Sequence, residues 1–231
     1  MKRILQPELL DSLPENDPRA VRSRRDLRRV NAWMRNHSIM ARALESSLNG
    51  HALRLITELG AGDGHFLLRI AQKTASNWTG VNATLLDRQK NVSAGTLAAF
   101  AKSGWHAEVV VEDVLAWSPA PGSGRAIIAN LFLHHLENEQ LAQLLQKICR
   151  SSRLFVAIEP RRFARPAFVG PLLRLIGCND VTRHDAVISI RAGFAGNELS
   201  ALWPDKTNWQ LTERPAGLFS HLFIARKIIE S

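Results

Sequence analysis

Residues 56–66 read Ile-Thr-Glu-Leu-Gly-Ala-Gly-Asp-Gly-His-Phe, and they carry the strongest structural signal in the chain. It follows an apolar run, and the apolar residues of 67–74 recur at helical spacing. Gly60, Gly62 and Gly64 alternate with other residues between the two. Glycine permits a positive φ and has no Cβ, so a ligand can lie directly on the backbone. The stretch therefore predicts a strand, a ligand-binding glycine turn, and a helix whose N-terminal N–H groups face the ligand.

The spacing of the glycines narrows the choice of ligand. A dinucleotide fingerprint reads G-x-G-x-x-G, whereas here the third glycine comes one residue early. Glu58 lies two residues before Gly60, where a carboxylate would attract a cationic amine and repel a phosphate. These features argue against a nicotinamide dinucleotide. A glycine turn that binds no ligand is the structural alternative.

Residues 58–64, E-L-G-A-G-D-G, resemble motif I of the class I S-adenosylmethionine (SAM) methyltransferases. The resemblance implies that SAM is the cofactor and that its amino-acid end lies on the glycine turn. Glu58 would then act through its charge or a bridging water. The cofactor-binding residues expected from this motif are Glu58, Gly60, Ala61, Gly62 and Gly64.

Length and composition indicate an ordinary globular protein. The chain has 231 residues, of which 45% are hydrophobic and 22% charged, enough for one domain with a full core. We expect a helical extension or cap over residues 1–50 and a methyltransferase domain over 51–231. No signal peptide or membrane-spanning stretch is evident, so a cytoplasmic location without membrane attachment is expected. Cys149 and Cys178 cannot make a metal site between them, and we expect no metal.

Continuous apolar strands alternate with amphipathic helices along most of the chain, which predicts an α/β fold with a parallel sheet covered on both faces. Two antiparallel strands follow, giving the Rossmann-like, mostly parallel seven-stranded sheet of the resembling family. One continuous helix is expected before the first strand, over 19–48, and a lid after the fifth strand, over 160–194. The expected strands are 53–59, 81–87, 105–112, 125–131, 153–159, 209–213 and 218–225, and the expected later helices are 64–76, 88–102, 137–150 and 196–202.

Ligands of open parallel sheets bind beyond the carboxyl ends of the strands. Asp87 ends the second strand and can accept both hydrogen bonds of a ribose diol. The resemblance puts Asp113 at the adenine amino group, with the backbone of Val114 nearby. Asn130, at the end of the fourth strand, completes the expected cofactor site. A lone aspartate at a strand end is often just a turn residue, so that alternative stays open.

The segment after Asn130 indicates the type of methyltransferase. It lacks the D/N-P-P-Y/F motif of enzymes that methylate base amines, and neither cysteine lies in a nucleophile motif. Residues 133–140, L-H-H-L-E-N-E-Q, resemble the L-H-D-W-S-D-E segment of plant-type O-methyltransferases, where the first histidine is the general base. That histidine corresponds to His134, although His135 and Leu136 depart from the pattern. Histidine titrates near neutrality and suits removal of a hydroxyl proton. The alternative is that the histidines cap a helix or fill the pocket wall.

Over residues 25–230 the chain resembles bacterial small-molecule methyltransferases, including those that modify polyketide or other aromatic metabolites. In that family N-terminal helices often cover the pocket, so Trp33 is a candidate substrate residue, whereas His37 is expected in the core. The resemblance also suggests an acceptor site formed by polar residues of the lid. A salt-bridge network that ties the lid down is the alternative. The remaining candidate substrate residues are His135, Arg161, His184, Asp185 and Arg191.

The net charge of +9 includes six arginines in residues 19–29. They are not interleaved with aromatics, and no RNA-binding module is visible, so we interpret them as a solvated helix face and do not expect nucleic acid as a partner. The leading hypothesis is a SAM-dependent methyltransferase that acts on a small-molecule hydroxyl or phenol with a histidine base, as a monomer or homodimer. The alternatives are an RNA methyltransferase and a non-catalytic SAM-fold partner protein.

Overall fold

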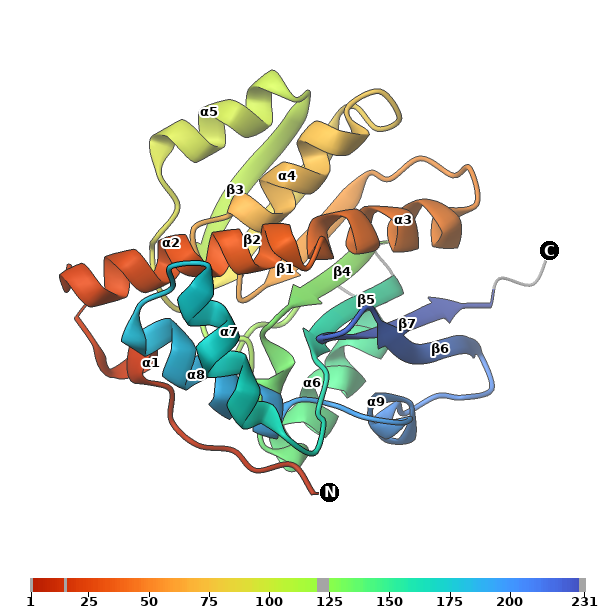
Figure 1. Cartoon of the computed structure of the whole chain (residues 1–231). Helices are drawn as coiled ribbons and strands as arrows, with labels where there is room; N and C mark the ends of the chain where they lie inside the picture. The colour runs from red at the N-terminus through yellow and green to blue at the C-terminus, as the bar shows by residue number, and fades with distance from the viewer. Residues whose placement is uncertain (1, 15, 120–124, 229–231) are drawn as a thin grey trace.

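Seven strands form one mixed sheet in the computed structural model, which describes residues 2–14, 16–119 and 125–228 (Figure 1). The strand order is β3-β2-β1-β4-β5-β7-β6, and only β7 runs antiparallel to its neighbours. This confirms the predicted sheet and its antiparallel last pair. The strands are β1 (Leu55–Leu59), β2 (Val81–Asp87), β3 (Trp105–Val111), β4 (Arg125–Asn130), β5 (Ser152–Pro160), β6 (Trp209–Ala216) and β7 (Ser220–Lys227).

The strand order places a ligand crevice between β1 and β4. The chain runs outward from β1 to β3 and then returns to β4 on the other side of β1. The connections leave β1 and β4 in opposite directions, so a crevice opens beyond their carboxyl ends. Thr57 of β1 pairs with Ile127 of β4, which brings the ends of these two strands together at Leu59 and Asn130.

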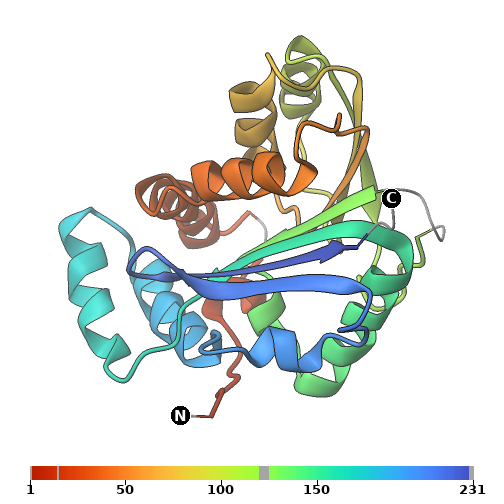
Figure 2. The same cartoon turned by 90° about the vertical axis from the view of Figure 1, so that its right-hand side faces the viewer.

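Helices cover both faces of the sheet, as predicted (Figure 2). On one face, α3 (Asn36–Leu48), α4 (His65–Thr74) and α5 (Ala94–Lys102) share an apolar core with the strands. On the other, α6 (Asn138–Ser151) and α9 (Glu198–Leu202) pack over a second core that contains three tryptophans. Both cores bury side chains completely, which is the main source of stability for the sheet.

The remaining helices gather beyond the carboxyl ends of the strands (Figure 1). They are α1 (Leu9–Ser12) and α2 (Pro18–Trp33) from the N-terminus, and η2 (Pro166–Phe168), α7 (Val169–Leu175) and α8 (Asp180–Ala192) from the segment predicted as a lid. Ser23 of α2 hydrogen-bonds Thr182 of α8 at 2.9 Å, so the two segments form one layer. None of the described helices has the length and apolar character needed to cross a bilayer.

Two expectations about helices were wrong. The apolar stripe over 19–48 is divided between α2 and α3, because Arg35 adopts a left-handed backbone with φ 58°. A helix cannot continue through that conformation. The helix expected over 88–102 begins at Ala94, where the side chain of Ser93 accepts a hydrogen bond from Thr96 N. The other expected elements are present, with ends displaced by a few residues.

Candidate active site

The glycine turn after β1 is shaped by three residues with positive φ, and each has a different environment. A Cβ on Gly60, at φ +66°, would lie 2.2 Å from the ring of Phe132. A Cβ on Gly64, at φ +73°, would meet Leu85 at 3.0 Å. A Cβ on Gly62, at φ +55°, would meet nothing within 4 Å, because this residue borders a cavity. Gly60 and Gly64 therefore allow close packing, and Gly62 leaves its backbone open to a ligand.

Glu58 lies under this turn with its side chain buried. Its Oε2 has no hydrogen-bond partner among the described residues. Burial, reinforced by the nearby charges of Asp63 and Asp87, raises the pKa of Glu58 well above its usual range. A buried carboxylate oxygen without a partner is costly, and a cationic ligand would relieve that cost. The α-amino group and sulfonium of SAM are cations, so this residue fits the cofactor implied by motif I.

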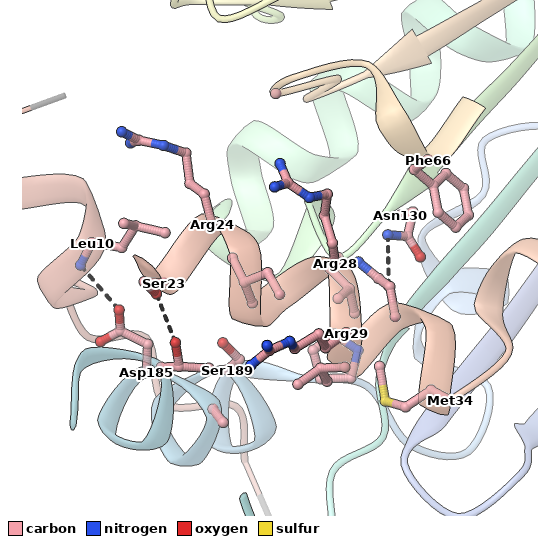
Figure 3. Close-up of a pocket in the computed structure, with 18 of the residues that line it drawn as sticks. Leu10, Ser23, Arg24, Arg28, Arg29, Met34, Phe66, Asn130, Asp185 and Ser189 are labelled. Atoms are coloured by element: carbon pink, nitrogen blue, oxygen red, sulfur yellow. Dashed lines mark hydrogen bonds between the residues drawn. The ribbon is translucent and has the colours of Figure 1, made fainter. Parts of the chain in front are cut away.

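A cavity of about 840 Å³ is lined both by residues of the glycine turn and by the two histidines after β4. Figure 3 shows part of its lining. Its floor is formed by residues of the 58–63 and 130–135 segments. Its roof is formed by Glu8, Leu10 and residues of α2, the start of α3, α7 and α8. Apolar side chains of the roof, including Leu27, Val30 and Leu173, line it beside polar ones. The volume lies in the range of pockets that bind small molecules.

Four of the predicted cofactor residues lie outside the described cavity wall. Gly64 packs against β2 instead. Asp87 lies next to the turn, because its Oδ2 accepts a hydrogen bond from Gly62 N at 2.8 Å. Asp113 accepts from Leu115 N at 2.8 Å, which is the turn-forming role left open as its alternative, and Val114 is buried in the second core. Gly64 belongs to the glycine turn itself, and Asp87 contacts the turn through Gly62 N.

Asn130 ties the floor to the roof through side-chain amides. Its Oδ1 accepts from Asn36 Nδ2 at 3.2 Å, and its Nδ2 donates to Asn31 Oδ1 at 3.2 Å. Asn36 also donates to Asn31 at 3.1 Å and accepts from the hydroxyl of Ser220 at 2.8 Å. This network fixes the junction between α2 and α3 over the end of β4. Asn130 is labelled in Figure 3.

Glu159, at the end of β5, organises the turn that carries His134. Its fully buried carboxylate accepts hydrogen bonds from the backbone N–H groups of Phe132, Leu133 and His134 at 2.9–3.3 Å. It also lies 2.8 Å from His134 Nδ1, so that nitrogen donates and Nε2 faces the roof. A carboxylate at Nδ1 orients an imidazole and stabilises its protonated form. The pair therefore has the geometry of a base dyad.

A second carboxylate approaches His134 from the roof. Glu8 Oε1 lies 3.5 Å from His134 Nε2, and the hydroxyl of Ser189 in α8 donates to the same carboxylate. Burial lowers the pKa of His134, but hydrogen bonds and charges from Glu159 and Glu8 outweigh it and raise the pKa to about 9. His134 is therefore mostly protonated at neutral pH in this structure.

His135 lies beside His134 with the ring centroids 4.2 Å apart and the planes at 34°. Glu8, His134 and His135 place possible metal-ligand atoms within 4.8 Å of one another. Glu159 already occupies Nδ1 of His134, and Glu8 faces its Nε2, so both ring nitrogens have carboxylate neighbours within the protein. The absence of a metal remains our prediction.

The arginines of α2 are not only a solvated face, as the sequence suggested. Arg24, Arg25, Arg28 and Arg29 all border the cavity. Arg28 Nη1 lies 2.5 Å from Asp63 Oδ2 of the glycine turn, and Figure 3 shows Arg28 on the same side of α2 as Arg24.

Contrary to expectation, His37 also lines the cavity and is not a core residue. Trp33 lines it too, with its ring centroid 5.5 Å from that of Phe219.

Only one of the four polar lid residues singled out in the sequence borders the cavity. Asp185 does, but its carboxylate accepts from Leu9 N and Leu10 N at 2.8 and 3.0 Å (Figure 3). His184 and Arg191 point away, since α8 turns its buried face to the site and leaves these two exposed. Arg161 does not border the cavity either, and its backbone N–H donates to Phe219 O. The acceptor contacts expected for Arg161, His184 and Arg191 do not fit this placement.

The sequence left open that a salt-bridge network ties the lid down, and Arg162, next to Arg161, forms such contacts. Arg162 is buried and donates to Gly193 O at 2.6 Å and to Glu198 Oε1 at 2.5 Å. This arginine ties the start of the lid to its end.

Sequence reasoning missed Glu8, Glu159 and Ser189. Glu159 carried a usable signal, because it ends the fifth strand just as Glu58 and Asp87 mark earlier strand ends. Glu8 and Ser189 had no sequence signal of this kind. They reach His134 from segments 181 residues apart in the chain, and only the folded roof brings them together.

Comparison with known proteins identifies a methyltransferase domain and a shared fold. Residues 56–153 match the methyltransferase domain family, and no curated protein sequence matches the chain. The solved plantazolicin methyltransferase BpumL, in complex with S-adenosylhomocysteine (SAH), is 12% identical with a TM-score of 0.63, over 92% of this chain and 91% of that one. An O-methyltransferase family protein from Burkholderia thailandensis is 14% identical with a TM-score of 0.59, over 94% and 62%.

The N-methyltransferase NodS from Bradyrhizobium japonicum, also solved with SAH, is 15% identical with a TM-score of 0.52, over 92% and 90%. At identities this low the likeness establishes a shared fold. The matched domain covers the glycine turn, both acidic strand ends and the two histidines.

Proposed function

We propose that this chain, a class I SAM-dependent methyltransferase by its domain and fold, methylates a hydroxyl oxygen of a small-molecule acceptor. One observation carries the proposal. A single cavity connects the glycine turn of motif I to a histidine that a buried carboxylate orients. Methyl transfer to oxygen needs both a cofactor site and a proton acceptor beside it.

The residues of the floor fit SAM, which supplies an electrophilic methyl group when bound. Glu58 would face its cationic amino-acid end, and the open backbone of Gly62 would lie against the cofactor. Asp87, held beside Gly62 N, would bind the ribose. We keep Asp113 and Val114 as proposed neighbours of the adenine.

The dyad of His134 and Glu159 would accept the proton that the acceptor hydroxyl loses. Glu159 fixes Nδ1–H of His134 and leaves Nε2 toward the cavity. Because the pKa of His134 is raised to about 9, the base acts in the minority of molecules in which Nε2 is unprotonated at neutral pH. In that form Nε2 would take the hydroxyl proton of the acceptor whose oxygen receives the methyl group that SAM supplies. Placement of the oxygen in line with the methyl group contributes most of the acceleration, and the base adds a factor of roughly 100 or more.

The roof supports an acceptor with an apolar or aromatic body. Leu27, Val30, Leu173, Trp33 and Phe219 line it. The resemblance to methyltransferases of aromatic metabolites and the fold shared with an O-methyltransferase family protein agree with this choice. The α2 arginines gather at the cavity and so favour a small acidic group over a nucleic-acid strand.

The dyad is tested by His134→Ala. This variant should bind SAH with unchanged affinity in calorimetry and lose at least ~100-fold in turnover with a phenolic acceptor found by screening the wild type. His184→Ala is the matched control, because that exposed histidine also contacts a carboxylate but lies outside the cavity. Equal turnover of wild type and His134→Ala would remove the base from the mechanism. Failure of the wild type to bind SAH would remove the proposed function itself.

A further inference from the structure

The N-terminal segment of residues 3–13 lies over the site, and we call this segment the strap. Arg3 donates to the carbonyls of His134, Leu136 and Ala192 at 2.9–3.3 Å and places its guanidinium 4.4 Å from the ring centroid of Phe194. Ile4 N donates to Arg191 O at 3.1 Å. The strap is thus held by specific hydrogen bonds along the edge of α8 and the histidine turn.

The strap carries Glu8 into the cavity. On one side of Glu8 the backbone continues to Leu9 and Leu10, whose N–H groups are both held by Asp185. Its carboxylate receives the hydroxyl of Ser189 and faces His134 Nε2 at 3.5 Å. With only 12% of its side chain exposed, Glu8 is an ionisable group placed inside the site, at the nitrogen that the acceptor must use.

We propose that Glu8 is a positioning residue of the acceptor site, delivered by the strap to hold the Nε2 side of His134 and so to determine when that nitrogen can take a proton. This inference rests on the proposed function, because it concerns the same histidine. With Glu8 docked, a proton on Nε2 lies between the imidazole and the carboxylate. An acceptor hydroxyl that reaches Nε2 takes the place of Glu8, and the strap must yield for it to enter.

The charges around His134 support this reading. Glu159 faces Nδ1 from β5, Glu8 faces Nε2 from the strap, and His135 lies against the ring from its own turn. Arg3 brings a positive charge to the backbone of the same turn. Asp185 on α8 is engaged by the strap's N–H groups. Glu8 is therefore the carboxylate whose distance from His134 changes if the strap moves, while Glu159 stays fixed in the sheet.

The test is an NMR titration of the His134 ring in isotope-labelled, SAH-saturated protein, with the signal assigned from its loss in His134→Gln. Removing the charge of Glu8 in Glu8→Gln should make His134 at least tenfold more acidic than in the wild type, a shift of one pKa unit or more. Glu8→Asp keeps the charge and should shift less. Glu139→Gln, at an exposed site in the first turn of α6, is the matched control and should not shift.

An unchanged His134 titration in Glu8→Gln, or equal shifts in Glu8→Gln and Glu8→Asp, would overturn the proposal. Ser189→Ala, which removes the hydroxyl that steers Glu8, should shift the titration in the same direction by a smaller amount. Because the titration needs no turnover, its result is separate from the proposed function. Loss of methyl transfer to every acceptor would refute that function, whereas an active enzyme with an unshifted titration would refute only the role of Glu8.

Discussion

The floor and the roof of the cavity are built in different ways. The floor takes Glu58, Gly60 and Gly62 from one short stretch, and its shape comes from backbone conformation and from strands paired across the crevice. The roof brings together residues from the strap, α2, α7 and α8, which are far apart in the chain, and its shape comes from side-chain hydrogen bonds. The floor, which is the cofactor half of the site, is thus part of the sheet fold. The roof, which is the acceptor half, is formed by separate segments that pack over the floor.

The largest effect should come from a single methyl group added to the floor. Gly60→Ala would place a Cβ 2.2 Å from the Phe132 ring on a backbone with positive φ. Overpacking and backbone strain should together cost about 4 kcal/mol of unfolding free energy, measured by urea denaturation, and SAH binding should fall at least ~100-fold in calorimetry.

The matched control is Gly50→Ala, which has φ +84° but open space around its Cβ. It should cost only about 1 kcal/mol and leave SAH affinity unchanged. If Gly60→Ala behaved like Gly50→Ala, the floor would tolerate a side chain as well as an open turn does, and its shape would not depend on close backbone packing.

A smaller effect should appear where floor and roof meet at His134. Its pKa of about 9 in the folded protein lies above its ordinary value of 6.5, because Glu159 and Glu8 outweigh the effect of burial. The resulting stabilisation is fully present below pH 6.5 and is lost as the pH rises through about 9. Between these limits the unfolding free energy should drop by roughly 3 kcal/mol in the wild type.

Thermal unfolding at a series of pH values measures this slope, with His134→Gln as the control that should lack it. A wild type as stable at pH 9.5 as at pH 6.5 would mean that Glu159 and Glu8 do not hold a proton on His134.

The smallest effect should come from the contact between α2 and the glycine turn. Arg28 and Asp63 form a partly exposed ion pair, and such pairs contribute about 1 kcal/mol or less. Arg28→Gln should therefore speed SAH dissociation by about threefold in stopped-flow measurements at low salt. The difference from wild type should vanish near 1 M salt, where charges are screened. A larger, salt-independent change would mean that α2 belongs to the cofactor half.

The same contrast explains what the sequence could predict. Glu58, the glycines and Asp87 follow one another at fixed spacings around β1 and β2, so local pattern was enough to place them near the turn. His134 was found because it follows a strand end. Glu8 and Ser189 have no such local signal, and His184 was a plausible residue on the wrong face of α8. Which face of α8 is buried depends on packing against α1 and α2, which no periodicity within α8 alone reveals.

Trp33 gives the search for the acceptor a built-in optical reporter. Its indole lines the cavity and is 48% exposed, whereas the other five tryptophans of the chain are each 6% exposed or less. Iodide in solution will therefore quench mainly this one fluorophore. A compound that enters beneath the roof will shield it, so protection from quenching ranks a library by occupancy before any methylated product has been identified.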